Sequence, residues 1–239
     1  MPTPRPAEPQ PEEPRPAEPQ PTESQPEKLQ PAEPQPEQPQ PESPRSKVLL
    51  VTGHPRPDSL TAQLVRHAQE RLTAEGHTVD LLDLDAEGFD PRMTPADEPD
   101  WADRDKEYSP EVRAHMRRVA EADAIVVVFP LWWFGLPALL KGWIDRVWNH
   151  GFAYGGRKKL LARKRMLWLG LVSYDQARFA ELGFEDSVRL TLGKGISEFC
   201  GMAPERVAVR YVYESLSAGE GAFKTLDGAL DELLPKGPR

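Results

Sequence analysis

Three aromatic side chains stand in a row at residues 132–134, in the segment PLWWFG that follows an apolar run. Polar residues are usual where a strand leads into a helix, so this composition needs a reason. Backbone groups near Leu131 and Trp132 could hydrogen-bond the edge of a flat heterocycle, while Trp133 and Phe134 pack against it or its reaction partner. For the segment alone, aromatics that only fill space beneath a loop are an equally good explanation.

A second segment, GHPRPDSLT at 53–61, offers groups that suit a phosphate. Ser59 and Thr61 stand at a predicted helix start, where free N–H groups and the positive end of the helix dipole attract anions, and His54 could add a donor. N-capping by Asp58 or Ser59 is the alternative, and the charge of Asp58 would repel a phosphate if it pointed inward. The segment matches neither the dinucleotide motif G-x-G-x-x-G nor the G-K-[ST] of a nucleotide-binding loop.

The apolar pattern predicts the elements that position these segments. From residue 46 on, short β-branched runs alternate with runs of helical spacing. Strands are expected at 47–53, 78–84, 124–129, 165–172 and 206–212, and helices at 59–76, 109–122, 137–150, 185–201 and about 221–234. This alternation predicts an α/β fold, a doubly wound parallel sheet of five strands with helices on both faces.

The predicted sheet brings the two segments together. In open parallel sheets, ligands bind at the carboxyl ends of the strands, where the strand order reverses. With the flavodoxin-like order 2-1-3-4-5, this point lies between the first and third strands, so the loops at 53–60 and 130–136 should meet there. Two candidate segments at one point favour a bound aromatic phosphate ester such as a flavin.

Composition separates a tail from the rest of the chain. Residues 1–45 hold 16 of the 27 prolines and repeat the unit PAEPQP from residues 6, 16 and 31. Such a segment has too little apolar surface to offset the entropy of folding, so it is predicted to be a disordered tail rich in Pro and Glu. The folded domain is then 46–239. A solvated spacer is the simpler role for the tail, and a ligand for a proline-binding module is the alternative.

Charge and cysteine content exclude several classes of protein. The formal charge of −8 disfavours bulk binding of nucleic acid. Cys200 is the single cysteine, which excludes an intramolecular disulfide and a cysteine-based metal cluster, and no metal site is expected. The sequence has neither an apolar run long enough to span a membrane nor an apolar segment at its N-terminus. Direct membrane insertion is therefore not expected, and a cytoplasmic location is expected.

Three segments carry a family resemblance: HPRPDSL, FPLWWFGLPALLKGWIDRV and GFAYG. Together they resemble the flavodoxin-like NAD(P)H quinone oxidoreductase family, over about residues 47–235. The resemblance implies an enzyme in which hydride passes from NADH or NADPH through a flavin to a quinone-like acceptor, with ping-pong kinetics. The flavin would be FAD, with FMN as the alternative. The family also works as a homodimer with its active site at the interface.

The resemblance also implies roles for particular residues. The flavin phosphate region would be held by His54, Ser59, Leu60 and Thr61. The isoalloxazine would be bordered by Pro130, Leu131, Trp132, Trp133 and Phe134, with the last two facing the shared nicotinamide and quinone pocket. Tyr154 in GFAYG would close this pocket from the other subunit. The helix LPALLKGWIDRVW at 136–148 would belong to the dimer contact, and an oligomer would then bury Trp143 and Trp148, which a monomer would expose.

One departure from the family follows the fourth strand. Mammalian members carry a Thr-Thr-Gly-Gly turn there, and then a Tyr and a His that stabilise charge on the reducing flavin. This chain has LGLVSYDQARFAELGF, with Gly170 and Ser173 near the turn and no histidine after it. Gly170 and Ser173 are therefore predicted to border the flavin, and Tyr174 is predicted as a proton donor near it. A surface tyrosine in a loop is the alternative for Tyr174.

Two other functions remain open at this point. The chain could be a flavin electron carrier, although such carriers usually have a strongly acidic docking face and the domain is only mildly negative. It could also be a nicotinamide-binding regulatory subunit of a membrane transport protein, a role that some bacterial relatives of the resembled family have. The acidic tail would then serve as a tether.

Overall fold

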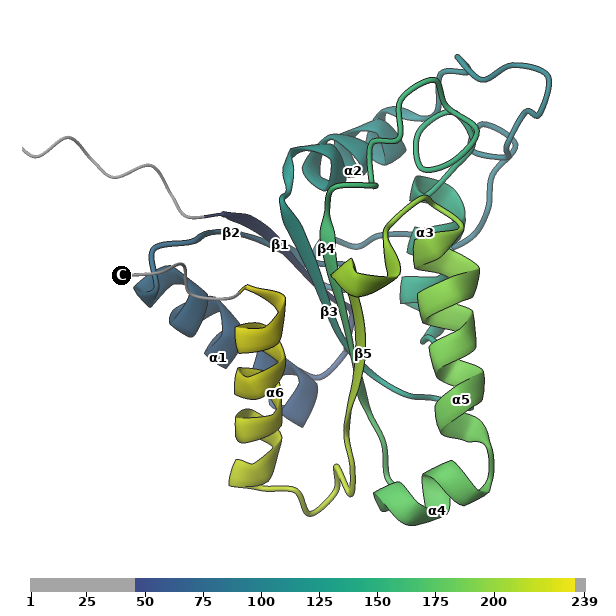
Figure 1. The fold of residues 1–239 in the computed structure, drawn as a ribbon. Coiled ribbons are helices and arrows are strands. Elements are labelled where there is room, and N and C mark those ends of the chain that lie inside the picture. The colour runs from purple at the N-terminus through teal and green to yellow at the C-terminus, as the bar shows by residue number, and fades with distance from the viewer. Residues whose placement is uncertain (1–45, 235–239) are drawn as a thin grey trace, which may run out of the picture. The chain divides into compact units, whose positions relative to one another are not determined.

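The computed structural model describes residues 46–234 (Figure 1). The predicted tail at 1–45 and the last five residues, 235–239, lie outside the described residues, so the prediction of disorder stays a prediction. Within the described domain no helix has both the length and the apolar character that a membrane span needs.

Five parallel strands form a single sheet in the order β2-β1-β3-β4-β5. Their bounds are β1 Lys47–Thr52, β2 Thr78–Asp83, β3 Ala124–Pro130, β4 Arg165–Leu171 and β5 Val207–Val212. In the register of the central strands, Val48 of β1 stands opposite Val79 of β2 on one side and Ala124 of β3 on the other. The predicted strand order is confirmed, and with it the reversal of order between β1 and β3.

Helices cover both faces of the sheet, as predicted (Figure 1). One face is covered by α1 Leu60–Ala74 and α6 Glu220–Leu233. The other is covered by α2 Pro110–Glu121, α3 Ala138–Val147, α5 Phe184–Arg189 and the π-helix η1 Leu190–Glu198. The short α4 Gln176–Glu181 and the 3-10 turn η2 Pro204–Arg206 complete the described elements. Strand β3 is buried along its apolar length because its side chains alternate between the two cores.

Trp143 of α3 and Trp148, directly after this helix, are buried within this chain. Trp143 is 0% exposed and Trp148 is 4% exposed, and both belong to the core between α3 and the sheet. The Nε1–H of Trp143 donates to Nδ1 of His115, 3.3 Å away. The expectation that these tryptophans would need an oligomer to cover them is therefore wrong, because the sheet and α2 already cover them.

The segment after β4 also differs from the prediction of one helix over 185–201. It contains α4, then α5, and then the π-helical run of η1. Asp175 begins α4 by accepting a hydrogen bond from the N–H of Arg178. Gly183, with φ of 75°, ends α4 and redirects the chain into α5, because a left-handed residue cannot continue a helix.

Candidate functional site

The two segments singled out in the sequence line one cavity at the reversal point of the sheet. This cavity measures about 250 Å³ and opens at the carboxyl ends of β1, β3 and β4. Its lining comprises His54, Arg56, Ser59, Leu60, Thr61, Pro130, Leu131, Trp132, Leu171, Ser173, Ser215 and Leu216. We call it the first cavity. The structure thus brings together seven of the residues predicted to hold a flavin, together with Ser173.

The N-terminus of α1 gives the first cavity an anion-binding character. Ser59 is the N-cap, and its hydroxyl accepts a hydrogen bond from the N–H of Ala62 at 3.2 Å. The next backbone N–H groups, those of Leu60 and Thr61, lie too early in the helix for an intrahelical acceptor. Asp58 is exposed and outside the lining, so its charge does not enter the cavity. Ser59 therefore caps the helix, which was the alternative to phosphate binding, but this capping leaves the site open to a phosphate.

Two cationic or donor side chains complete this end of the first cavity. Nδ1 of His54 accepts a hydrogen bond from the backbone N–H of Arg56, 3.1 Å away. This contact assigns the ring proton of a neutral His54 to Nε2, which leaves Nε2–H as a donor. Arg56 adds a permanent positive charge, and the lining contains no carboxylate. The first cavity is therefore suited to an anionic group.

The aromatic segment after β3 forms a tight turn with unusual backbone angles. Trp133 and Phe134 have φ of 51° and 57°, and the N–H of Gly135 donates to the carbonyl of Trp132 at 3.1 Å. Positive φ at both central residues is the arrangement of a type I′ turn, which strongly favours Gly, Asn and Asp. We call residues 132–135 the aromatic turn. Its two central aromatics are held in strained conformations.

The backbone groups near Leu131 and Trp132, which were predicted to bind the edge of a heterocycle, are partly used within the chain. The N–H of Leu131 donates to the carbonyl of Leu171, and the N–H of Trp132 donates to the carbonyl of Pro130. These two N–H groups are therefore already used within the chain. Within 46–234, no acceptor is found for the N–H groups of Trp133 and Phe134. The N–H donors available to a ligand are therefore those of Trp133 and Phe134, which follow Leu131 and Trp132.

A second, apolar cavity adjoins the first. It measures about 200 Å³ and is lined by Leu131, Trp133, Phe134, Val172, Ser173, Tyr174 and Phe179. Leu131 and Ser173 line both cavities. The site thus has one polar end with positive charge and one aromatic end without any charged side chain.

Trp133 cannot be core filler, because 96% of its surface is exposed. Its neighbour Phe134 is half-buried and stacks on Phe184, with ring centroids 3.5 Å apart and an angle of 8° between the planes. Tyr174 is 38% exposed, and its ring centroid lies 6.3 Å from that of Phe134. The predicted wall residue Trp133 and the predicted donor Tyr174 therefore lie together at the second cavity.

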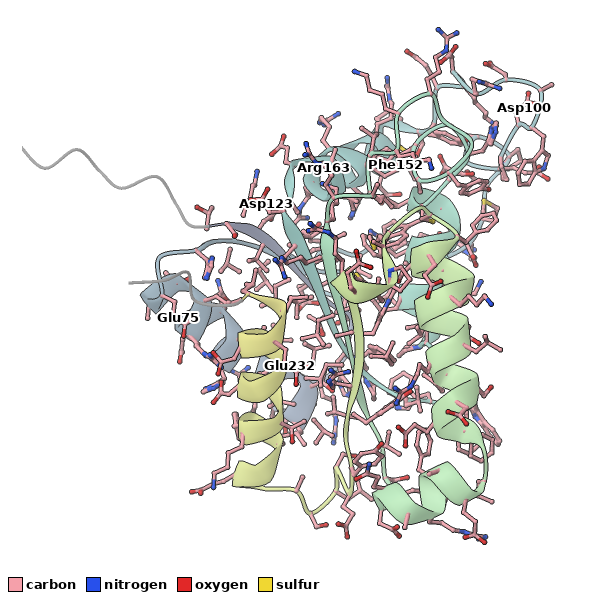
Figure 2. All side chains as sticks on the ribbon, in the orientation of Figure 1. Glu75, Asp100, Asp123, Phe152, Arg163 and Glu232 are labelled. Carbon is pink, nitrogen blue, oxygen red and sulfur yellow. The ribbon has the colours of Figure 1, made fainter. Side chains whose placement is uncertain are left out.

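Two predicted site residues lie elsewhere. Gly170 is inside β4, packed between Phe129 and Tyr211, because the strand continues through Leu171 before the loop begins. Tyr154 belongs to the loop between α3 and β4, which enters the sheet at the amino ends of the strands. Figure 2 labels Phe152 in this loop at the opposite end of the molecule from α4. Tyr154 therefore borders neither cavity of its own chain.

Tyr154 instead joins a cluster of aromatic side chains. Its ring centroid lies 5.8 Å from that of Trp101 and 5.2 Å from that of Phe199. Trp101 is 70% exposed and Phe199 is 64% exposed. Burial raises the pKa of Tyr154. Trp101 and Phe199 expose their rings beside the half-buried Tyr154, and we call these three residues the aromatic surface.

Sequence reasoning missed several residues of the site. Arg56 lies inside the first quoted segment, and its charge was a signal that could have been used. Ser215 and Leu216 come from the loop after β5, which the reversal point of the sheet does not indicate. Phe184 follows a glycine, and nothing in the sequence pairs it with Phe134, 50 positions earlier.

Known proteins resemble this chain closely enough to assign its family. A family model described as a flavodoxin-like fold matches residues 46–234. An uncharacterized NAD(P)H oxidoreductase of Escherichia coli strain K12 is 47% identical over 142 residues, which cover 59% of this chain and 72% of that protein. The ribosyldihydronicotinamide dehydrogenase [quinone] of Mus musculus is 37% identical over 123 residues, covering 45% of this chain and 53% of the mouse protein. The match thus spans about half the length of the mouse relative.

Solved structures give the same assignment. A putative quinone reductase from Klebsiella pneumoniae superimposes with a TM-score of 0.69 at 26% identity, covering 81% of this chain and 86% of that one. An NAD(P)H:quinone oxidoreductase from Methanothermobacter marburgensis gives a TM-score of 0.70 at 22% identity, covering 81% and 98%, and supports the fold alone. With the sheet order and the site at its reversal point, these matches show that the chain belongs to the flavodoxin-like fold family, among relatives named NAD(P)H oxidoreductases and quinone dehydrogenases.

Proposed function

We propose that the chain is a flavin-dependent NAD(P)H:quinone oxidoreductase. The observation that carries this proposal is the pair of adjoining cavities, one with cationic and N–H donors and one aromatic and uncharged, which share Leu131 and Ser173. A flavin mononucleotide has the same division into an anionic end and a flat heterocycle. The names of the bacterial and mammalian relatives support the same activity.

A bound flavin would supply the acceptance of hydride from a reduced nicotinamide and its transfer to a quinone. The residues of this chain would bind and orient the reactants. His54, Arg56 and the start of α1 would neutralise the phosphate, and Trp133 and Phe134 would provide an aromatic wall that excludes water. Tyr174 is the proposed proton donor because its hydroxyl-bearing ring borders the apolar cavity.

We propose FMN rather than FAD as the flavin. A terminal phosphate carries more negative charge than a bridging one, and the first cavity offers Arg56 and a helix N-terminus without any carboxylate. Arg56→Gln should therefore weaken FMN binding about three- to tenfold, with less effect at high salt, because the charge is exposed. Lys224→Gln makes the same charge change on an exposed part of α6 and serves as the control. Equal FMN and FAD affinities in both variants and in the parent protein would contradict the choice of FMN.

We also propose a homodimer in which Tyr154 reaches the site of the second copy. Tyr154 belongs to the loop between α3 and β4, at the amino ends of the strands, and its half-buried ring lies between the exposed rings of Trp101 and Phe199. An exposed group of large aromatics is typical of an interface. Phe199→Glu should therefore convert the dimer to a monomer in sedimentation analysis, and a monomeric parent protein would exclude the arrangement.

The absorbance spectrum and extracted cofactor of the purified protein provide the main test. A yellow protein with about one flavin per chain and steady turnover of NADH or NADPH with a quinone is expected from the two-cavity site. Flavin without turnover would favour the electron carrier. Nicotinamide binding together with a co-purifying transport protein would favour the regulatory subunit. A colourless protein that takes up neither FMN nor FAD would exclude the enzyme; the cytoplasmic location stays a prediction.

A further inference from the structure

Among the ring contacts of the aromatic turn, the one between Phe134 and Phe184 is the shortest; Trp132 lies 5.7 Å from His54 and Phe134 lies 6.3 Å from Tyr174, centroid to centroid. The rings of Phe134 and Phe184 lie face to face, with centroids 3.5 Å apart and planes 8° from parallel. Phe184 begins α5 directly after Gly183, the left-handed residue that ends α4. Two segments that are distant in the sequence thus meet ring on ring beside the second cavity.

Phe184 connects this contact to the rigid interior. Its ring centroid lies 6.1 Å from that of Phe179, which is 0% exposed and also lines the second cavity. Phe179 in turn packs edge-to-face on Tyr211 of β5, at 5.4 Å. Among residues 46–234, no ring contact is found for Trp133. Of the two strained aromatics, Phe134 is therefore anchored and Trp133 is not.

A turn of this kind needs contacts from outside to persist. Left-handed backbone is unfavourable for a residue with a side chain, and two such residues in succession remain only where surrounding structure holds them. We propose that Phe184 is a positioning residue, whose stack on Phe134 holds the aromatic turn in the conformation that displays Trp133 at the second cavity. This proposal rests on the proposed function, in which the turn borders the reactants.

The proposal predicts how substrate kinetics respond to Phe184. Without the stack, the aromatic turn spends time in other conformations. A ligand that binds only the conformation with Trp133 at the second cavity then has a lower apparent affinity, in proportion to the population of that conformation. The molecules that do bind have the same geometry as before. Loss of Phe184 should therefore raise KM and leave kcat nearly unchanged.

The test uses the full-length, flavin-loaded protein with NADH and a benzoquinone. In Phe184→Ala, the KM for the quinone should rise about three- to tenfold, in line with the usual contribution of an aromatic stack, and Phe184→Tyr should restore it. Leu182→Ala removes an exposed apolar side chain from the same connection and should leave KM unchanged. Phe184→Leu, which keeps apolar bulk without a ring, replaces the alanine variant if that variant does not fold. An unchanged KM in the ring-free variants, or an equal rise in Leu182→Ala, would overturn the proposal.

A thermal cycle tests the same contact without activity. The Tm is measured for Phe134→Ala, for Phe184→Ala and for the double variant. If the rings support each other, the double variant should lose about 2–4 °C less than the sum of the single losses. Additive losses would show that the stack does not couple the two segments. Absence of flavin and turnover in the parent protein would contradict the proposed function, while this cycle would still decide on the stack.

Discussion

Backbone strain collects at the candidate site. Three non-glycine residues in the described range have positive φ: Trp133 and Phe134, in the aromatic turn, and Glu214, with φ of 48°. The N–H of Glu214 donates to the carbonyl of Tyr174, and the next residue, Ser215, lines the first cavity. A left-handed residue other than glycine lowers the free energy of unfolding by about 1–2 kcal/mol. Three such residues around one site indicate that these backbone conformations serve function rather than stability.

Trp133 provides the most direct test at this scale. We expect Trp133→Ala to lower kcat/KM about three- to tenfold for both nicotinamide and quinone, because a shared aromatic contact is lost. Its Tm should hardly change, since 96% of the side chain is exposed and no cavity can form. Trp133→Gly should show the same kinetic loss with a free energy of unfolding about 1 kcal/mol higher, because glycine relieves the positive φ. A destabilised Trp133→Ala with normal kinetics would end this interpretation.

A buried ion pair ties the long segment between β2 and α2 to α3. Asp97 is 0% exposed, and its carboxylate accepts hydrogen bonds from Nη2 of Arg146 at 2.8 Å and from the N–H of Ser109 at 2.9 Å. Burial alone would raise the pKa of Asp97, but the hydrogen bonds from Arg146 and Ser109 outweigh it and lower the pKa. This contact fixes the segment that carries Trp101 against the helix that follows the aromatic turn.

Arg146→Met should therefore destabilise the fold strongly. The variant leaves the Asp97 carboxylate buried without its partner, which typically costs about 3–5 kcal/mol. The double variant Arg146→Met/Asp97→Asn removes that charge and should recover part of the loss. Urea denaturation monitored by tryptophan fluorescence gives both values. A loss below about 1 kcal/mol would be typical of an exposed pair and would show that the contact is solvated.

His115 on α2 gives the fold a pH dependence. Burial lowers the pKa of this side chain, which lies in the core and accepts a hydrogen bond from Trp143. As the pH falls below about 6.5, the unfolded chain binds a proton that the folded chain resists, so stability should fall until the lower folded pKa is reached. His115→Gln keeps an acceptor for Trp143 and should flatten the fall in Tm between pH 7 and pH 5. At pH 8, where His115 is neutral in both states, the difference in Tm between the two proteins reports the change in packing alone. An unchanged dependence of Tm on pH in His115→Gln would contradict the assignment.

The sequence predicted the elements better than it predicted the connections between them. The apolar runs of β1, β3 and β4 and the cap at Ser59 are local signals, and each lies within a few residues of its expected position. The stack of Phe134 on Phe184 and the burial of Trp143 depend on contacts between distant segments, which period and composition do not contain. Gly170 belongs with these cases: the predicted strand at 165–172 already contained it, but its packing between Phe129 and Tyr211 depends on the neighbouring strands.

At the scale of the whole molecule, the site and the aromatic surface lie at opposite ends of the sheet. The cavities are lined by residues at and after the carboxyl ends of the strands. The loop of Tyr154, which also contains the labelled Phe152, lies at the amino ends (Figures 1 and 2). One copy therefore cannot bring Tyr154 to its own aromatic turn without rebuilding the fold. If Tyr154 takes part in the reaction at all, it does so in a second copy, which is why oligomeric state and activity should be measured on the same samples.

The contribution of residues 1–45 can be tested by their removal. Strand β1 begins at Lys47, and described residues form a buried cluster on each face of the sheet. The removed segment carries nine glutamates against four basic residues and hardly any large apolar side chain. We therefore expect the truncated protein to keep its flavin content and its Tm within about 2 °C, a shift smaller than the loss of one typical contact would cause. Both proteins should be compared at low and high salt, because the change in net charge alone can alter Tm at low salt. A Tm loss that persists at high salt, or a loss of flavin, would show that the segment packs against the domain.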